Sequence, residues 1–79
     1  MKTMLKFFIG RSKRIIQKLS QNKFFNKNYE VKEIEVLDND VRVKVINNGS
    51  EEFLDIPKKV MGNNRDEDFF VSNLISNAQ

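Results

Sequence analysis

"VRVKVINNGSEEFLDIP" (residues 41–57) decides the fold, because it holds two predicted strands and the turn that joins them. Its valines alternate with Arg42 and Lys44, and this period of two predicts a strand with one apolar face and one wet, basic face. The dipeptide Asn48-Gly49 accepts the left-handed backbone that a two-residue hairpin turn needs. We therefore predict a β-hairpin centred on this dipeptide.

The predicted sheet gains a third strand on the N-terminal side of the hairpin. "YEVKEIEVL" followed by "DND" indicates a strand and a turn, which complete a three-stranded antiparallel meander over residues 29–57. The apolar residues of this first strand change phase, and the shift implies a bulge near Glu33. Pro57 cannot donate a hydrogen bond to a neighbouring strand, so we expect the third strand to end there.

An amphipathic helix that covers this sheet is predicted over residues 1–21. At about 100° per residue, its apolar and small side chains share one arc of about 140°, and the cations occupy the remaining arc or its edge. Phe7 stands among the cations, and Phe24 or Phe25 in the following connection is expected to cap the core. The arc that we expect to face the sheet holds Met1, Met4, Leu5, Phe8, Ile9, Ser12, Ile15, Ile16 and Leu19.

A short C-terminal helix is predicted over residues 64–77. Asn63 and Asn64 are both candidates for its N-cap, and the acids of "DED" (residues 66–68) complement the positive end of the helix dipole. A three-stranded sheet needs a helix to bury its apolar face. We therefore expect one α+β domain over residues 1–79, built of two layers in the order α-β-β-β-α.

The composition excludes most catalytic and metal chemistry. The 79 residues include no Cys and no His, so the commonest zinc ligands and the usual activator of a serine nucleophile are missing. We interpret the acids Glu51-Glu52 as a solvated strand start and residues 66–68 as helix-dipole acids, in preference to a Mg²⁺ site. We predict a protein that is not an enzyme and has no cofactor and no bound metal.

Charge is divided unequally along the chain. Residues 1–28 contain eight Lys or Arg and no acid, whereas residues 29–79 contain six Lys or Arg and eleven acids, so formal charges of +8 and −5 underlie the overall +3. This asymmetry favours a polyanionic partner for the basic part. The cations would contact phosphates, and Phe7 would stack on an unpaired base. The predicted contacts with nucleic acid (RNA or DNA), or with an acidic protein surface, are Lys6, Phe7, Arg11, Lys13, Arg14, Lys18, Lys23, Lys27, Arg42 and Lys44.

The run "VKEIEVLDNDVRVKVINNGSEEFLDIPKKVM" followed by "DFFVSNLI" resembles the small KTSC domain family over residues 31–75. Residues 64–68, "NRDED", replace the Ser-Gly step that is usual in that family. The resemblance implies a meander followed by an aromatic-rich helix, an association with RNA metabolism, and no active site. The features that carry the resemblance are the hydrophobic spacing, Gly49, Ile56-Pro57 and Phe69-Phe70.

Two other functions stay open. Small chains rich in Asn and Lys are common among phage or mobile-element proteins that inhibit a host protein by covering its surface, which is an association by composition alone. A basic amphipathic helix can also lie on a membrane surface, although its apolar side cannot face lipid and the sheet together.

Lys6 interrupts the first apolar run, which argues against a secretory signal. The N-terminal segment is more similar to a mitochondrial transit peptide, which is also amphipathic and poor in acids. We expect a cytoplasmic protein.

Overall fold

The computed structural model describes residues 2–78. The predicted α-β-β-β-α order is confirmed, and a 3₁₀-helix that the sequence did not indicate follows the last strand. The elements are α1 (Lys2–Gln21), β1 (Tyr29–Val36), β2 (Asp40–Asn47), β3 (Ser50–Pro57), η1 (Lys58–Met61) and α2 (Asn64–Ala78). The predicted end of the third strand at Pro57 is also confirmed.

The sheet is an antiparallel meander in the order β1-β2-β3, as predicted. The expected bulge lies in β1, where the register against β2 shifts between Val31 and Glu33. Asn48 and Gly49 have φ values of 54° and 84° and join β2 to β3 in a two-residue turn. Positive φ at both central residues is the geometry that matches the twist of a tight hairpin. This turn fixes which residues of β2 and β3 face each other.

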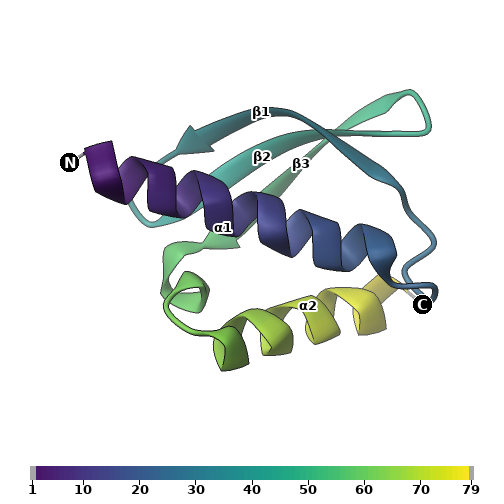
Figure 1. Cartoon of the computed structure of the whole chain (residues 1–79). Coiled ribbons are helices and arrows are strands. Elements are labelled where there is room, and N and C mark those ends of the chain that lie inside the picture. Colours follow the sequence, from purple (N-terminus) through teal and green to yellow (C-terminus); the bar gives the residue numbers. More distant parts are fainter. Residues whose placement is uncertain (1, 79) are drawn as a thin grey trace.

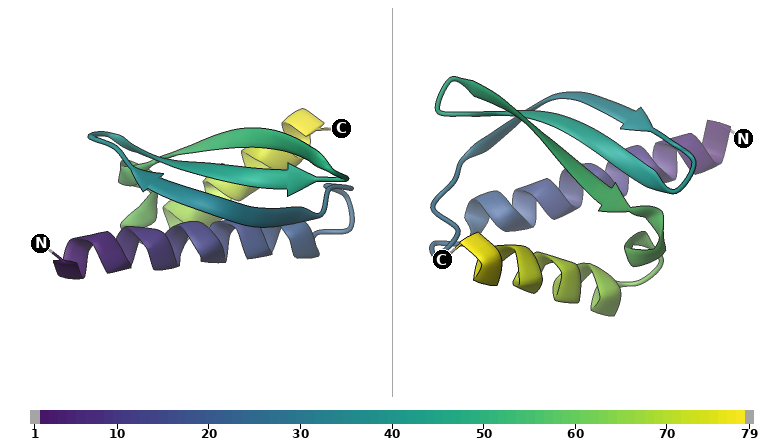
Figure 2. Two further views of the ribbon diagram at one scale, coloured as in Figure 1. Left: turned by 90° about the horizontal axis from the view of Figure 1, so that it is seen from above. Right: turned by 180° about the vertical axis from the view of Figure 1, so that it is seen from behind.

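Both helices lie on one side of the sheet, and the other side is uncovered (Figures 1 and 2). The apolar face of α1 packs against β1 and β2, and α2 lies beside α1 and runs in roughly the same direction (Figure 1). Phe25 in the α1–β1 connection and Met61 of η1 close the core, so the prediction that Phe24 or Phe25 caps it is confirmed, with Phe25 in that role. The buried apolar residues are Ile15, Ile16, Leu19, Phe25, Val41, Val43, Val45, Ile56, Met61 and Val71.

The N-terminal turns of α1 are less covered than its apolar arc predicts. Leu5 is 48% exposed, although the arc places it toward the sheet. The first turns of α1 extend past the strands, so they have little to pack against (Figure 2). Met1 lies outside the described residues, and the side chain of Met4 is likewise outside what the structure describes, so the expectation for both stays a prediction.

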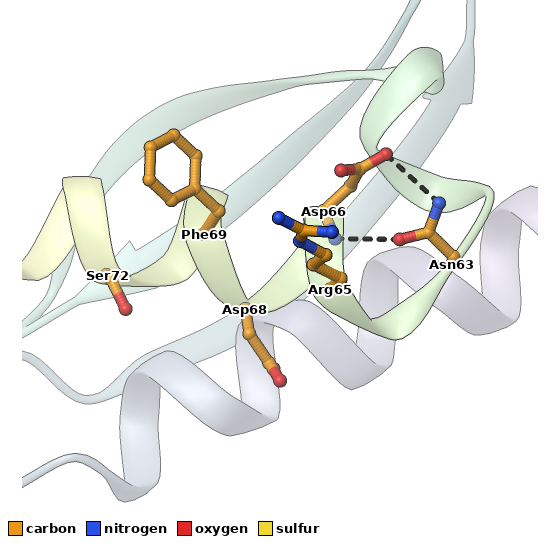
Figure 3. A pocket seen from close by; sticks show the side chains of 6 residues that line it. All are labelled: Asn63, Arg65, Asp66, Asp68, Phe69 and Ser72. Carbon is orange, nitrogen blue, oxygen red and sulfur yellow. Dashed lines mark hydrogen bonds between the residues drawn. The ribbon is translucent and has the colours of Figure 1, made fainter.

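Asn63 caps α2, which decides between the two candidate residues. The backbone N–H of Asp66 donates to Asn63 Oδ1 at 2.9 Å, and Asn63 Nδ2 donates to Asp66 Oδ2 at 3.1 Å (Figure 3). A side-chain acceptor at this position satisfies one of the free N–H groups in the first helical turn. The cap therefore fixes where α2 begins and how its first turn meets α1.

Candidate functional site

A buried carboxylate from α2 lies among the cations of α1. Glu67 has no exposed surface, although it belongs to the acid cluster that the sequence indicated as helix-dipole acids. Arg11 Nη1 donates to Glu67 Oε2 at 2.7 Å, and Lys18 Nζ lies 3.5 Å from Oε1. Arg14 Nε lies 3.7 Å from the same Oε1. A buried ion is tolerated only where partners replace its lost hydration, and these three cations supply that replacement.

The same cations bind the rest of the first turn of α2. Arg14 Nη2 donates to Asn64 Oδ1 at 3.0 Å, and Lys18 Nζ donates to Asp68 Oδ1 at 2.9 Å. Within the described residues, Glu67 Oε1 accepts no hydrogen bond despite its two nearby cations. This ion cluster, which we define as Arg11, Arg14 and Lys18 with Asn64, Glu67 and Asp68, joins the two helices across their polar edges.

The cations of α1 therefore form two sets and do not form one outward patch. Arg11 and Lys18 face α2, whereas Lys6 and Lys13 are exposed to solvent. Among residues 2–78, no ion pair joins Lys6 or Lys13 to an acid. Arg14 belongs to both sets, because its side chain is 47% exposed while it contacts the buried carboxylate. The sequence spacing alone shows that residues 11, 14 and 18 share one side of the helix. It gave no sign that Glu67 is their partner.

Phe7 lies at the edge of the α2-facing set. Its side chain is 40% exposed, and the Arg11 guanidinium carbon lies 5.2 Å from the ring centroid. Phe8 contacts the ring edge-on, with the centroids 5.5 Å apart. Arg11 thus makes a cation–π contact with Phe7 while it donates to Glu67. Arg11 therefore occupies part of one face of the Phe7 ring, which the sequence predicted to stack on a base.

Lys23 and Lys27 lie in the α1–β1 connection and are held differently. Lys23 Nζ lies 5.2 Å from the ring centroid of Phe24, which is 61% exposed. Lys27 Nζ lies 3.7 Å from Glu52 Oε1 and within 6 Å of the rings of Phe25 and Tyr29, at 5.8 and 5.9 Å. Lys27 is therefore oriented by its surroundings, whereas Lys23 contacts an exposed ring.

Glu52 is the centre of a small polar cluster at the end of the sheet near the β2–β3 turn. Asn47 Nδ2 donates to its Oε2 at 3.1 Å, and the Tyr29 hydroxyl donates to its Oε1 at 3.2 Å. The Asn47 hydrogen bond, helped by the charge of Lys27, holds the pKa of Glu52 below its ordinary value against the opposing effect of burial. Burial and the nearby Glu52 charge raise the pKa of Tyr29.

This cluster predicts a loss of stability in acid. Because the folded-state pKa of Glu52 lies below the unfolded value, its contribution is present above the unfolded pKa and is lost as the pH falls through the folded pKa. We expect the difference in unfolding free energy between the wild type and Glu52→Gln to shrink below about pH 4. Urea unfolding at a series of pH values measures it. A difference that stays constant from neutral to acid pH would contradict this role of Glu52.

Arg42 and Lys44 lie on the outer face of the sheet, away from both helices. Arg42 donates to both carboxylate oxygens of Asp55, at 2.9 and 3.4 Å, and this contact holds the pKa of Asp55 below its ordinary value. Lys44 Nζ lies 3.9 Å from Glu33 and 3.8 Å from Glu51. The outward face of β2 carries Arg42 and Lys44 as predicted, but the outer face of the whole sheet is not basic. Acids from both neighbouring strands surround the two cations, so these cations do not extend the basic surface of α1.

A surface hollow lies beside the start of α2 and offers no reactive arrangement. It has a volume of about 790 Å³ and is lined by the side chains drawn in Figure 3, among them Arg65, Asp66, Asp68 and Phe69. Phe69 is 69% exposed. No group of three or more His, Cys, Asp or Glu residues in the described part of the chain is placed to hold a metal ion. The structure thus adds no catalytic constellation at this hollow.

The described helices include none that is both long and apolar enough to span a membrane. The apolar side of α1 from Ser12 to Leu19 is buried in the fold, so it is not available to lipid while the sheet is covered.

No protein-family model, no curated protein and no solved structure matches the chain. The KTSC resemblance accordingly stays a prediction, and function has to be inferred from the distribution of charge and exposed side chains.

Proposed function

We propose that the chain is a non-catalytic module that binds a nucleic-acid backbone with the outward cations of α1. The observation that carries this proposal is the separation of charge between the two sides of the molecule. α1 contains no acid, and Lys6 and Lys13 are exposed on it. The opposite side, the outer sheet face, is rich in acids that already bind its cations. A polyanion would be attracted to one side and repelled by the other.

The proposed phosphate contacts are Lys6, Lys13 and the exposed part of Arg14. Lys6 and Lys13 are seven residues apart on one helix, about 10.5 Å along its axis, so they suit separate phosphates of one backbone. Lys23 extends this surface beyond the end of α1. Arg11 and Lys18 are not among these contacts, because they bind Glu67 and Asp68 of α2. Phosphate contacts position a protein without reading sequence, so this surface suits RNA and DNA alike.

Binding of a mixed-sequence RNA oligonucleotide at increasing salt tests the proposal. Each neutralised phosphate should contribute about −0.7 to −0.9 to the slope of log affinity against log salt. Three contacts therefore predict a slope of roughly −2 to −3. Fluorescence anisotropy of the labelled oligonucleotide provides the measurement. Absence of binding at about 50 mM salt, or binding that salt does not weaken, would exclude this function.

A second candidate function, occlusion of a host protein's surface by a phage or mobile-element protein, is favoured by one observation. Phe69 stands 69% exposed beside a hollow of about 340 Å³ that Val60 and Phe70 also line. An exposed aromatic next to such a hollow is the kind of side chain that anchors a protein interface. Recovery of one stoichiometric protein from nuclease-treated lysate, lost in Phe69→Ala but kept in Lys6→Gln, would select this function over nucleic-acid binding.

A further inference from the structure

A polar hollow lies where the α1–β1 connection meets the β2–β3 turn. Its volume is about 370 Å³, and every residue that lines it carries an amide, hydroxyl or ammonium group. It lies at the C-terminal end of α1, so a backbone that follows the outward lysines of the helix leads toward it. The residues that line it include Ser20, Lys23, Asn26, Lys27, Asn28 and Asn48.

Three of the amides in this lining are available to a ligand. No hydrogen bond found among residues 2–78 uses the side chains of Asn26, Asn28 or Asn48. Asn26 and Asn48 have positive φ values of 57° and 54°, so tight turns fix the backbone that carries their side chains. A primary amide presents an acceptor and two donors side by side, which is the pattern that the edges of nucleic-acid bases complement.

Two lysines line the hollow with these amides, and one of them contacts an exposed aromatic ring. Lys27 is oriented by Glu52 at 3.7 Å, and Lys23 Nζ lies 5.2 Å from the centroid of the Phe24 ring. The nearby carbonyl end of α1 disfavours an anion, so an anion in this hollow has to bind the two lysines. Phe24 leaves 61% of its surface free, although an aromatic side chain of this size is normally buried.

We propose that this hollow binds one nucleotide of a single-stranded nucleic acid. The base stacks on Phe24, its edge bonds to the amides of Asn28 and Asn48, and its phosphate lies between Lys23 and Lys27. This inference rests on the proposed function and adds that the bound nucleic acid is single-stranded. In a duplex the bases stay stacked on one another and cannot reach the ring, whereas an unpaired base is free to do so.

Anisotropy titrations with an oligouridine of about 12 nucleotides and with a duplex RNA of the same length test this inference. Phe24→Ala should weaken oligouridine binding by about 10-fold or more, the usual effect of losing one stacked base, and should leave duplex binding unchanged. Phe24→Tyr keeps the ring and should retain the affinity. Phe53→Ala is the matched control, because Phe53 is 64% exposed on the outer sheet face, far from the helices. The side-chain amide resonances of Asn28 and Asn48 should shift when oligouridine is added.

The outcomes separate this inference from the function on which it rests. If Phe24→Ala leaves oligouridine binding unchanged while Lys6→Gln weakens both probes, the nucleotide site is wrong and backbone binding stands. If Phe24→Ala and Phe53→Ala weaken binding equally, the effect does not come from the hollow and the inference again fails. If neither probe binds the wild type at low salt, both proposals fail.

Discussion

Replacement of Glu67 by alanine is expected to lower the free energy of unfolding by about 3–5 kcal/mol, the usual cost of removing one partner from a buried ion pair. Glu67 is wholly buried, and Arg11 donates to it at 2.7 Å. Without the carboxylate, Arg11 loses its anionic partner, and Lys18 keeps only the exposed Asp68. The total free energy of unfolding expected for a chain of 79 residues is roughly 4–12 kcal/mol, so this single change would remove about a quarter of it or more.

Asp68→Ala is the matched control for this prediction. Asp68 neighbours Glu67 in α2 and accepts from Lys18 at 2.9 Å, but its side chain is 67% exposed. Exposed ion pairs contribute about 1 kcal/mol or less, because water competes with both partners. Urea unfolding followed by circular dichroism measures both variants. Equal, small effects at the two positions would show that burial of Glu67 has no energetic consequence.

Replacement of both Lys6 and Lys13 by glutamine should lower the affinity for an RNA oligonucleotide by about 100-fold at 0.1 M salt, because each phosphate contact contributes roughly one power of ten there. The slope of log affinity against log salt should become less steep by about 1.4–1.8. Both side chains are exposed and unpaired among residues 2–78, so the fold should be unaffected. These two positions are better tests than Arg11 and Lys18, whose loss would also release α2.

The control is a double variant with the same change in net charge elsewhere. Lys32 in β1 and Lys59 in η1 are both exposed and lie off α1. Lys32→Gln with Lys59→Gln should leave the affinity within about threefold of the wild type, since neither lysine is a proposed phosphate contact and salt screens exposed charges that lie farther from the phosphates. If the two double variants weaken binding to the same extent, net charge determines the affinity and α1 is not the binding surface.

The parts of the fold that follow from short-range rules were predictable. Asn48-Gly49 forms the tight turn because these residues tolerate positive φ, and the period of two in β2 fixes which face is buried. The register that this turn sets also places Arg42 opposite Asp55. The acidic neighbours of the β2 cations were therefore available from the sequence once the turn was known, although the expectation of a basic face overlooked them.

The ion cluster was not predictable in this way. That Glu67 is buried, while its neighbours Asp66 and Asp68 are exposed, depends on how α2 is placed against α1. No pattern within either helix determines that placement, since α2 is also held by Val71 in the core and by the turn after η1. The predicted contacts on α1 consequently included Arg11 and Lys18, which the fold uses internally.

The ion cluster joins residues that are 56 positions apart, from Arg11 in the first helix to Glu67 in the last. At a synthesis rate of about 5–20 residues per second, Arg11 is therefore made roughly 3–11 s before Glu67. In that interval the cations of α1 do not yet have the buried carboxylate as a partner. Completion of α2 then pairs Arg11 and Lys18 with acids, so the nascent chain is a stronger polycation than the finished protein.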